Sequence, residues 1–86
     1  MHKLSNRLAY LRKKKGITLK EMSQELGDIK VTTISRYEHG RREPKLNTLI
    51  KIANYFDCSV DYLLGRTDQK HNIEKSNNFS FLWMSD

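Results

Sequence analysis

Apolar residues recur along this chain at helical spacing, in short runs that end at glycines. Leu4, Leu8 and Leu11 fall at i, i+4 and i+7, so one face of residues 4–15 is apolar while the other positions are mostly basic. We therefore expect an amphipathic first helix that ends at Gly16. Such a helix needs other elements to cover its apolar face.

A capping box and a glycine stop predict a second helix. Thr18 and Glu21 are three residues apart, the spacing at which a hydroxyl and a carboxylate each accept a hydrogen bond from a backbone amide at a helix start. Gly27 supplies the stop, because glycine tolerates a positive φ. The apolar positions between these signals keep helical spacing: Leu19, Met22 and Leu26.

The next apolar pair predicts a third short helix. Ile34 and Tyr37 lie at i and i+3, which favours a buried role for both. Gly40 closes this helix. Its other faces carry Thr32, Thr33, Ser35 and Arg36.

Two further helices complete the expected domain. Pro44 suits the approach to a fourth helix because its fixed φ fits the first turn, and Ser59 is a good N-cap for a fifth helix, which Gly65 ends. The apolar stripe of the fourth consists of Leu46, Leu49, Ile50, Ala53 and, less regularly, Phe56; that of the fifth consists of Val60, Leu63 and Leu64. We expect an all-α fold, a compact five-helix domain over residues 1–66, followed by a polar linker from residue 67 to 78.

Length and composition limit the function classes. A chain of 86 residues suffices for one domain. It shows neither an apolar run long enough to span a membrane nor a secretory signal, and its single cysteine agrees with a reducing compartment, so we expect a cytoplasmic protein. His2, His39 and His71 lie far apart, and no metal-binding spacing or glycine-rich phosphate loop is present. Neither an enzyme nor a cofactor or metal site is expected.

The positive charge is concentrated in one half of the chain. Residues 1–45 contain twelve Lys and Arg against five Asp and Glu, a net charge of +7, while the rest contain four against five, or −1. Such segregation favours a polyanionic partner, because basic side chains that neutralise phosphates release counterions from nucleic acid. An acidic membrane surface attracts the same charge. Two short helices joined by a turn in a basic all-α domain are typical of a helix-turn-helix, and favour nucleic acid.

Three stretches carry a family resemblance: "ITLKEMSQELG", "TISRYEHGRREP" and "LIKIANYFDCSVDYLLG". In this order and spacing, over residues 4–66, the chain resembles the Cro and lambda-repressor-like, or XRE, family of helix-turn-helix regulators. The resemblance implies a compact five-helix domain that binds specific double-stranded DNA, usually as a symmetric homodimer on an inverted repeat. It also implies a role in transcription regulation, in particular as a repressor.

Carried over by position, the resemblance implies base-reading roles on the third helix. They fall on Val31, Thr32 and Arg36, with Thr33 and Ser35 as neighbours. Arg36 is the strongest candidate, because a guanidinium can bind guanine O6 and N7 together; its alternative is a phosphate contact. Ile34 and Tyr37 remain core candidates.

The resemblance also implies contacts with the DNA backbone and one structural ion pair. The backbone candidates are Thr18, Lys20, Lys30, His39, Arg41 and Arg42. Glu38 is expected to pair with Arg12 and to lock the third helix to the first. Two departures affect this transfer: six residues separate Gly27 from Ile34 where the family usually has five, and Leu19 stands where the family often has glutamine.

The C-terminal end favours a role in association. It places apolar residues after the polar linker: Phe79, Phe81, Leu82, Trp83 and Met84. Because exposed apolar groups are costly, we expect them to contact a second copy or the domain itself, with a foreign partner as the alternative. A different class of function stays open with that alternative: an antitoxin-like module that binds a regulatory protein or peptide.

Overall fold

The computed structural model describes residues 2–71, which form five helices and contain no strand. They are α1 His2–Lys15, α2 Leu19–Leu26, α3 Val31–Glu38, α4 Leu46–Tyr55 and α5 Val60–Leu64. The expected all-α, five-helix fold is confirmed. None of these helices is both long and apolar enough to cross a bilayer.

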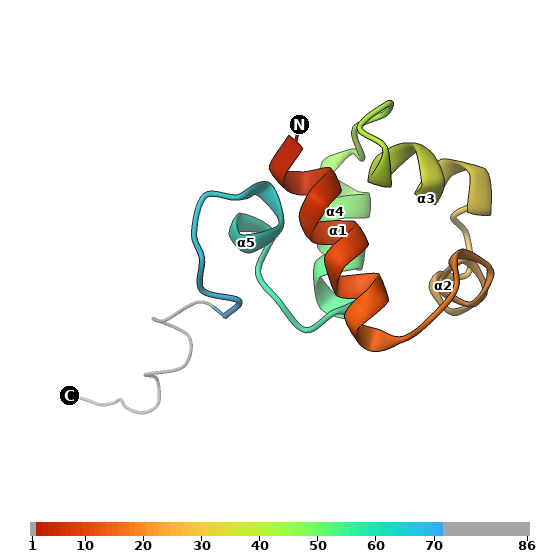
Figure 1. Ribbon diagram of the computed structural model, residues 1–86, viewed down its shortest axis with the longest axis horizontal. Helices are drawn as coiled ribbons and strands as arrows, with labels where there is room; N and C mark the ends of the chain where they lie inside the picture. The colour runs from red at the N-terminus through yellow and green to blue at the C-terminus, as the bar shows by residue number, and fades with distance from the viewer. Residues whose placement is uncertain (1, 72–86) are drawn as a thin grey trace.

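The helices are arranged around α1. In Figure 1, α1 crosses the middle of the molecule in front of α4, with α2 and α3 at one end and α5 at the other. The first helix packs on α3 and α5, α2 packs on α3 and α4, and α4 packs on α5. Their buried side chains form one core: Leu4, Leu8, Leu11, Met22, Leu26, Ile34, Tyr37, Leu49, Ile52, Ala53, Phe56, Tyr62 and Leu63.

The predicted capping groups are present at the helix ends. The Thr18 hydroxyl accepts a hydrogen bond from the Glu21 amide at 3.0 Å, and the Glu21 carboxylate accepts one from the Thr18 amide at 2.8 Å. The Ser59 hydroxyl accepts one from the Tyr62 amide at 3.0 Å. Gly27, at the end of α2, has a φ of 91°, which a residue with a Cβ rarely adopts.

The stripe predicted for α4 was wrong at two positions. Leu46 is 64% exposed and Ile50 is 43% exposed. The face that packs on the core instead consists of Leu49, Ile52, Ala53 and Phe56. These four residues follow the i, i+3, i+4, i+7 spacing of one helical face. Ile50 lies beside that face, and Leu46 lies in the first turn of the helix.

The segment after α5 is fastened to the domain. The Arg7 guanidinium donates hydrogen bonds to the Tyr62 carbonyl at 2.6 Å and the Thr67 carbonyl at 2.5 Å, and it pairs with Asp68 at 2.6 Å. The Ser59 amide donates to the Lys70 carbonyl at 2.7 Å. The first residues of the predicted linker thus pack on the domain. Positions 72–86, including Phe79, Phe81, Leu82, Trp83 and Met84, lie outside the described residues.

Candidate nucleic-acid interface

The third helix lies at the edge of the molecule, at the end opposite α5 (Figure 1). It is anchored from below by Ile34 and Tyr37, which are 0% and 5% exposed. The predicted core role of both residues is confirmed. Together with α2 and the turn between them, α3 forms a helix-turn-helix.

The predicted base-reading residues divide into two groups. Val31, Thr32 and Arg36 are exposed, whereas Thr33 and Ser35 are partly buried. Thr32 and Arg36 lie four residues apart and therefore on one face of the helix. Within the described residues, Arg36 forms no salt bridge, so its guanidinium is available to a ligand.

The turn before α3 contains an anchor that sequence reasoning missed. The Ser23 hydroxyl of α2 donates a hydrogen bond to the Ile29 carbonyl at 2.6 Å, and the Ile29 side chain packs against the core. Lys51 of α4 pairs with Asp28 at 2.5 Å, and this pair lowers the pKa of Asp28. These contacts accommodate the longer turn. The signal available in the sequence was an isolated isoleucine among polar turn residues.

The front of α3 has no side-chain cap. Lys30 occupies the N-cap position in extended conformation, and its side chain makes no capping hydrogen bond. The helix begins at Val31, immediately after it. The amides of this first turn therefore remain unsatisfied by a cap, and Lys30 itself is exposed.

The Arg12–Glu38 ion pair joins α3 to α1. Arg12 Nε lies 2.6 Å from Glu38 Oε2, and Arg12 Nη2 donates to Glu38 Oε1 at 3.1 Å. A third bond runs from Arg12 Nη1 to the Ile17 carbonyl at 2.9 Å, in the loop that precedes α2. Both side chains are mostly buried, with 15% and 6% exposed. The hydrogen bonds to Glu38 raise the pKa of Arg12, although burial opposes this effect.

A cationic hollow lies at the C-terminal end of α3, lined by Ser35, Arg36, His39 and Arg41. His39 Nδ1 lies 2.7 Å from the Ser35 carbonyl, which orients the imidazole against the helix end. The Arg41 amide donates to the Arg36 carbonyl at 2.9 Å and fixes the following loop. Two of the predicted backbone contacts, His39 and Arg41, therefore lie beside Arg36 at this end of the helix.

The other predicted backbone residues are spread over α2 and the loops. Thr18, Lys20 and Arg42 are all exposed, and the Thr18 hydroxyl already serves in the capping box. Leu19, which replaces a frequent glutamine, is partly buried against the core. No group of three or more potential metal ligands occurs in residues 2–71.

The comparisons with known proteins agree with this geometry. The chain matches the profile of the family described as "Helix-turn-helix" over residues 8–63. It is 38% identical to the HTH-type transcriptional regulator ImmR of Bacillus subtilis (strain 168) over 79 residues, which are 92% of this chain and 58% of that protein. It is 45% identical to the HTH-type transcriptional regulator AnsR of the same strain over 71 residues, 83% of this chain and 60% of that protein.

A phage protein shows similar agreement. The cryptic phage CTXphi transcriptional repressor RstR of Vibrio cholerae serotype O1 (strain ATCC 39315 / El Tor Inaba N16961) is 38% identical over 72 residues, 84% of this chain and 63% of that protein. The chain therefore spans about three-fifths of the length of these three relatives. From the match and the fold together, the chain belongs to the helix-turn-helix family of Cro and lambda-repressor-like, or XRE, regulators.

Proposed function

We propose that this protein is a sequence-specific, double-stranded DNA-binding transcriptional regulator that reads base edges with α3. The observation that carries the proposal is the two-sided character of this helix. Thr32 and Arg36 are exposed on one side, while Ile34 and Tyr37 are buried on the other. A rigidly seated helix with an exposed polar face fits a major groove that is wide enough to admit it.

The roles of individual residues follow from their chemistry. Arg36 binds a guanine through O6 and N7, Thr32 donates to a base or touches a thymine methyl, and Val31 offers apolar contact. Thr33 and Ser35, being partly buried, support these contacts from the flanks.

The DNA backbone is bound around this reading surface. The amides at the front of α3, together with Lys30, meet one phosphate, because uncapped helix N-termini attract anions. His39, Arg41 and Arg42 meet phosphates at the other end, and Lys20 and the Thr18 turn contact the backbone from α2. A net charge of +7 over residues 1–45 favours this placement on DNA.

The names of the relatives support a regulatory role. ImmR and AnsR are named transcriptional regulators, and RstR is named a transcriptional repressor. We infer that this chain represses transcription in the cytoplasm as a homodimer on an inverted repeat. The segment from Phe79 to Met84 contributes to that dimer.

Selection of bound duplexes from a random pool tests the proposal directly. A sequence-specific reader enriches one motif, and a dimer enriches an inverted repeat whose halves lie about one helical turn apart. Enrichment of a single half-site would contradict the dimer but would still support sequence-specific binding. No enrichment would overturn sequence-specific binding.

A salt titration on the selected duplex tests the electrostatic part. The logarithm of the binding constant should fall linearly with the logarithm of salt concentration, by roughly 0.9 for each neutralised phosphate. A flat response would favour the alternative of a module that binds a protein surface.

A further inference from the structure

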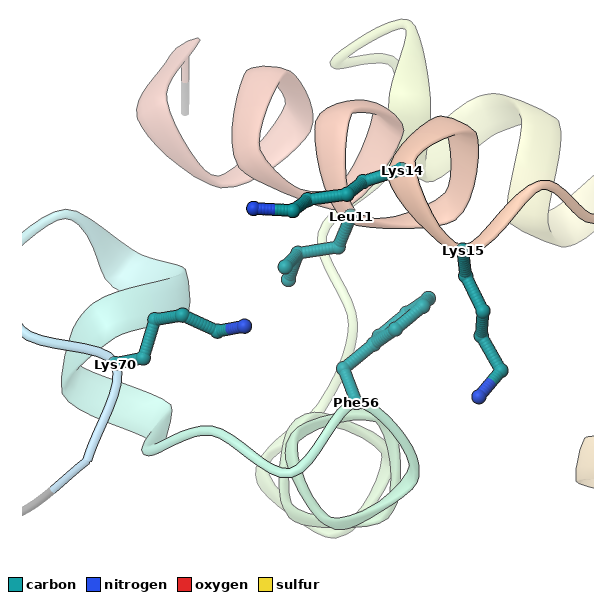
Figure 2. A pocket seen from close by; sticks show the side chains of 5 residues that line it. All are labelled: Leu11, Lys14, Lys15, Phe56 and Lys70. Carbon is teal, nitrogen blue, oxygen red and sulfur yellow. The ribbon is translucent and has the colours of Figure 1, made fainter.

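A second cationic hollow lies on the other side of α1 from α3. Figure 2 shows the five side chains that line it: Leu11, Lys14, Lys15, Phe56 and Lys70. The first three come from α1, Phe56 follows α4, and Lys70 follows α5. Because α1 stands between this hollow and α3, the hollow lies outside the surface that we propose reads DNA (Figure 2).

The hollow combines an apolar floor with a cationic rim. Leu11 and Phe56 belong to the hydrophobic core, and their side chains form the floor. Lys14 Nζ lies 3.4 Å from the Tyr10 hydroxyl, and Lys15 Nζ lies 5.0 Å from the centre of the Tyr55 ring. In the part of the chain that the structure describes, neither these two lysines nor Lys70 forms a salt bridge. Figure 2 shows the Lys14 and Lys70 ammonium groups on the same side of Leu11, whereas the Lys15 ammonium points away beyond Phe56, over the Tyr55 ring. Two ammonium groups that form no salt bridge attract an anion.

The position of Lys70 is fixed by the fold. The Ser59 amide binds the Lys70 carbonyl, and Arg7 holds the preceding residues Thr67 and Asp68. Figure 2 shows the Lys70 side chain extending from this segment toward Leu11. Lys70 therefore reaches the hollow because hydrogen bonds hold the backbone of residues 67–70 on the domain.

We propose that this hollow binds a small organic anion that carries one phosphate or carboxylate beside an apolar ring. Its volume of about 190 Å³ is below the roughly 300–1,000 Å³ of drug-sized ligand sites. It exceeds the roughly 150 Å³ of a cavity that accepts benzene, so one ring and one anionic group fit. The ring lies over Leu11 and Phe56, and the anion meets the ammonium groups of Lys14 and Lys70. Lysine suits this role, because an ammonium demands no particular anion geometry.

Nuclear magnetic resonance titration of the full chain with phenyl phosphate tests the proposal. The probe should shift the amide signals of the lining residues saturably. Phenol, which has only the ring, and inorganic phosphate, which has only the charge, should each bind more weakly. Shifts that spread over α3 instead, or equal affinity for inorganic phosphate, would overturn the proposal.

A pair of charge-matched variants separates this site from general attraction to a basic protein. Lys14→Gln with Lys70→Gln should weaken phenyl phosphate binding about fivefold or more, because it removes both ammonium groups that attract the anion. Lys13→Gln with Lys45→Gln removes the same charge from exposed positions outside the hollow and should have less effect. Circular dichroism verifies that both variants fold.

Equal weakening in the two double variants would overturn the site. The same variants are then compared for duplex binding. If the Lys14 and Lys70 variant weakened duplex binding more than its control, these lysines would serve DNA, and the proposal would again be overturned. A result confined to phenyl phosphate supports the site whether or not the DNA-reading role of α3 is correct.

Discussion

The ion pair between Arg12 and Glu38 determines how strongly α3 is held against α1. Glu38 accepts two hydrogen bonds from Arg12 in a mostly buried position, so its loss leaves a guanidinium without a counter-charge. We expect Glu38→Gln to lower the free energy of unfolding by about 3 kcal/mol, measured by urea denaturation. Asp28→Asn breaks the exposed pair with Lys51 and should cost much less. Similar losses in the two variants would show that burial does not strengthen the Arg12 pair.

Arg36 and Arg41 lie in the same hollow but are expected to have different roles. Arg36→Gln should relax one position of the motif selected from random duplexes, with about 1–3 kcal/mol less discrimination there. Arg41→Gln should weaken all sequences alike and lower the salt slope by about 1. Selection and salt titration of both variants check this contrast. If Arg36→Gln changed only overall affinity, Arg36 would be a phosphate contact.

At the scale of elements, a side-chain contact ties α4 to α2. The Tyr55 hydroxyl donates a hydrogen bond to the Glu25 carboxylate at 2.5 Å. Burial, together with this bond to Glu25, raises the pKa of Tyr55 from 10.0 to about 12. The folded state therefore keeps the phenol proton where the unfolded state loses it. This contribution to stability is fully present below about pH 10 and is lost as the pH rises toward 12.

Tyr55→Phe should consequently flatten the decline of unfolding free energy between pH 10 and 12. Urea denaturation across this range provides the measurement. Tyr10→Phe, which changes an exposed ring on α1, is the matched control and should leave the decline unchanged. An unaltered slope in Tyr55→Phe would mean that another group causes the decline.

Local signals predicted the elements well, and tertiary contacts explain the misses. The capping box of Thr18 and the N-cap of Ser59 depend on neighbours within three residues, so the sequence contains them in full. The Ser23 bond to the Ile29 carbonyl arises only after the turn folds back on α2, and no spacing rule indicates it. Helical spacing predicts that α4 has an apolar face, but the helices packed against α4 determine which of two neighbouring faces is buried. Ile50 is therefore exposed, although spacing predicts it for the core.

The candidate site could likewise be predicted from the sequence only in part. Spacing alone separated the buried Ile34 and Tyr37 from the polar positions of α3. The family resemblance supplied the Arg12–Glu38 pair, which joins residues 26 positions apart and leaves no local pattern. The hollow that contains Lys70 was not predicted, because the polar sequence after α5 gives no sign that Arg7 fastens it to α1.

At the scale of the whole molecule, the predicted association segment can be tested by truncation. Deleting residues 79–86 removes the apolar side chains proposed to contribute to the dimer. We expect the dimer population and the affinity for an inverted repeat to fall together, because each half-site then binds independently. Sedimentation and duplex titration measure the two quantities. If neither quantity changes, the segment has no role in association.

The fastening of residues 67–70 by Arg7 also determines where the rest of the chain is attached. The segment after α5 lies at the end of the molecule away from α3 (Figure 1). Any sequence after this segment starts far from α3, so it can change during evolution without altering the surface that we propose contacts base pairs. The longer relatives ImmR and AnsR agree with this interpretation, in which one DNA-binding domain is joined to different additional sequences.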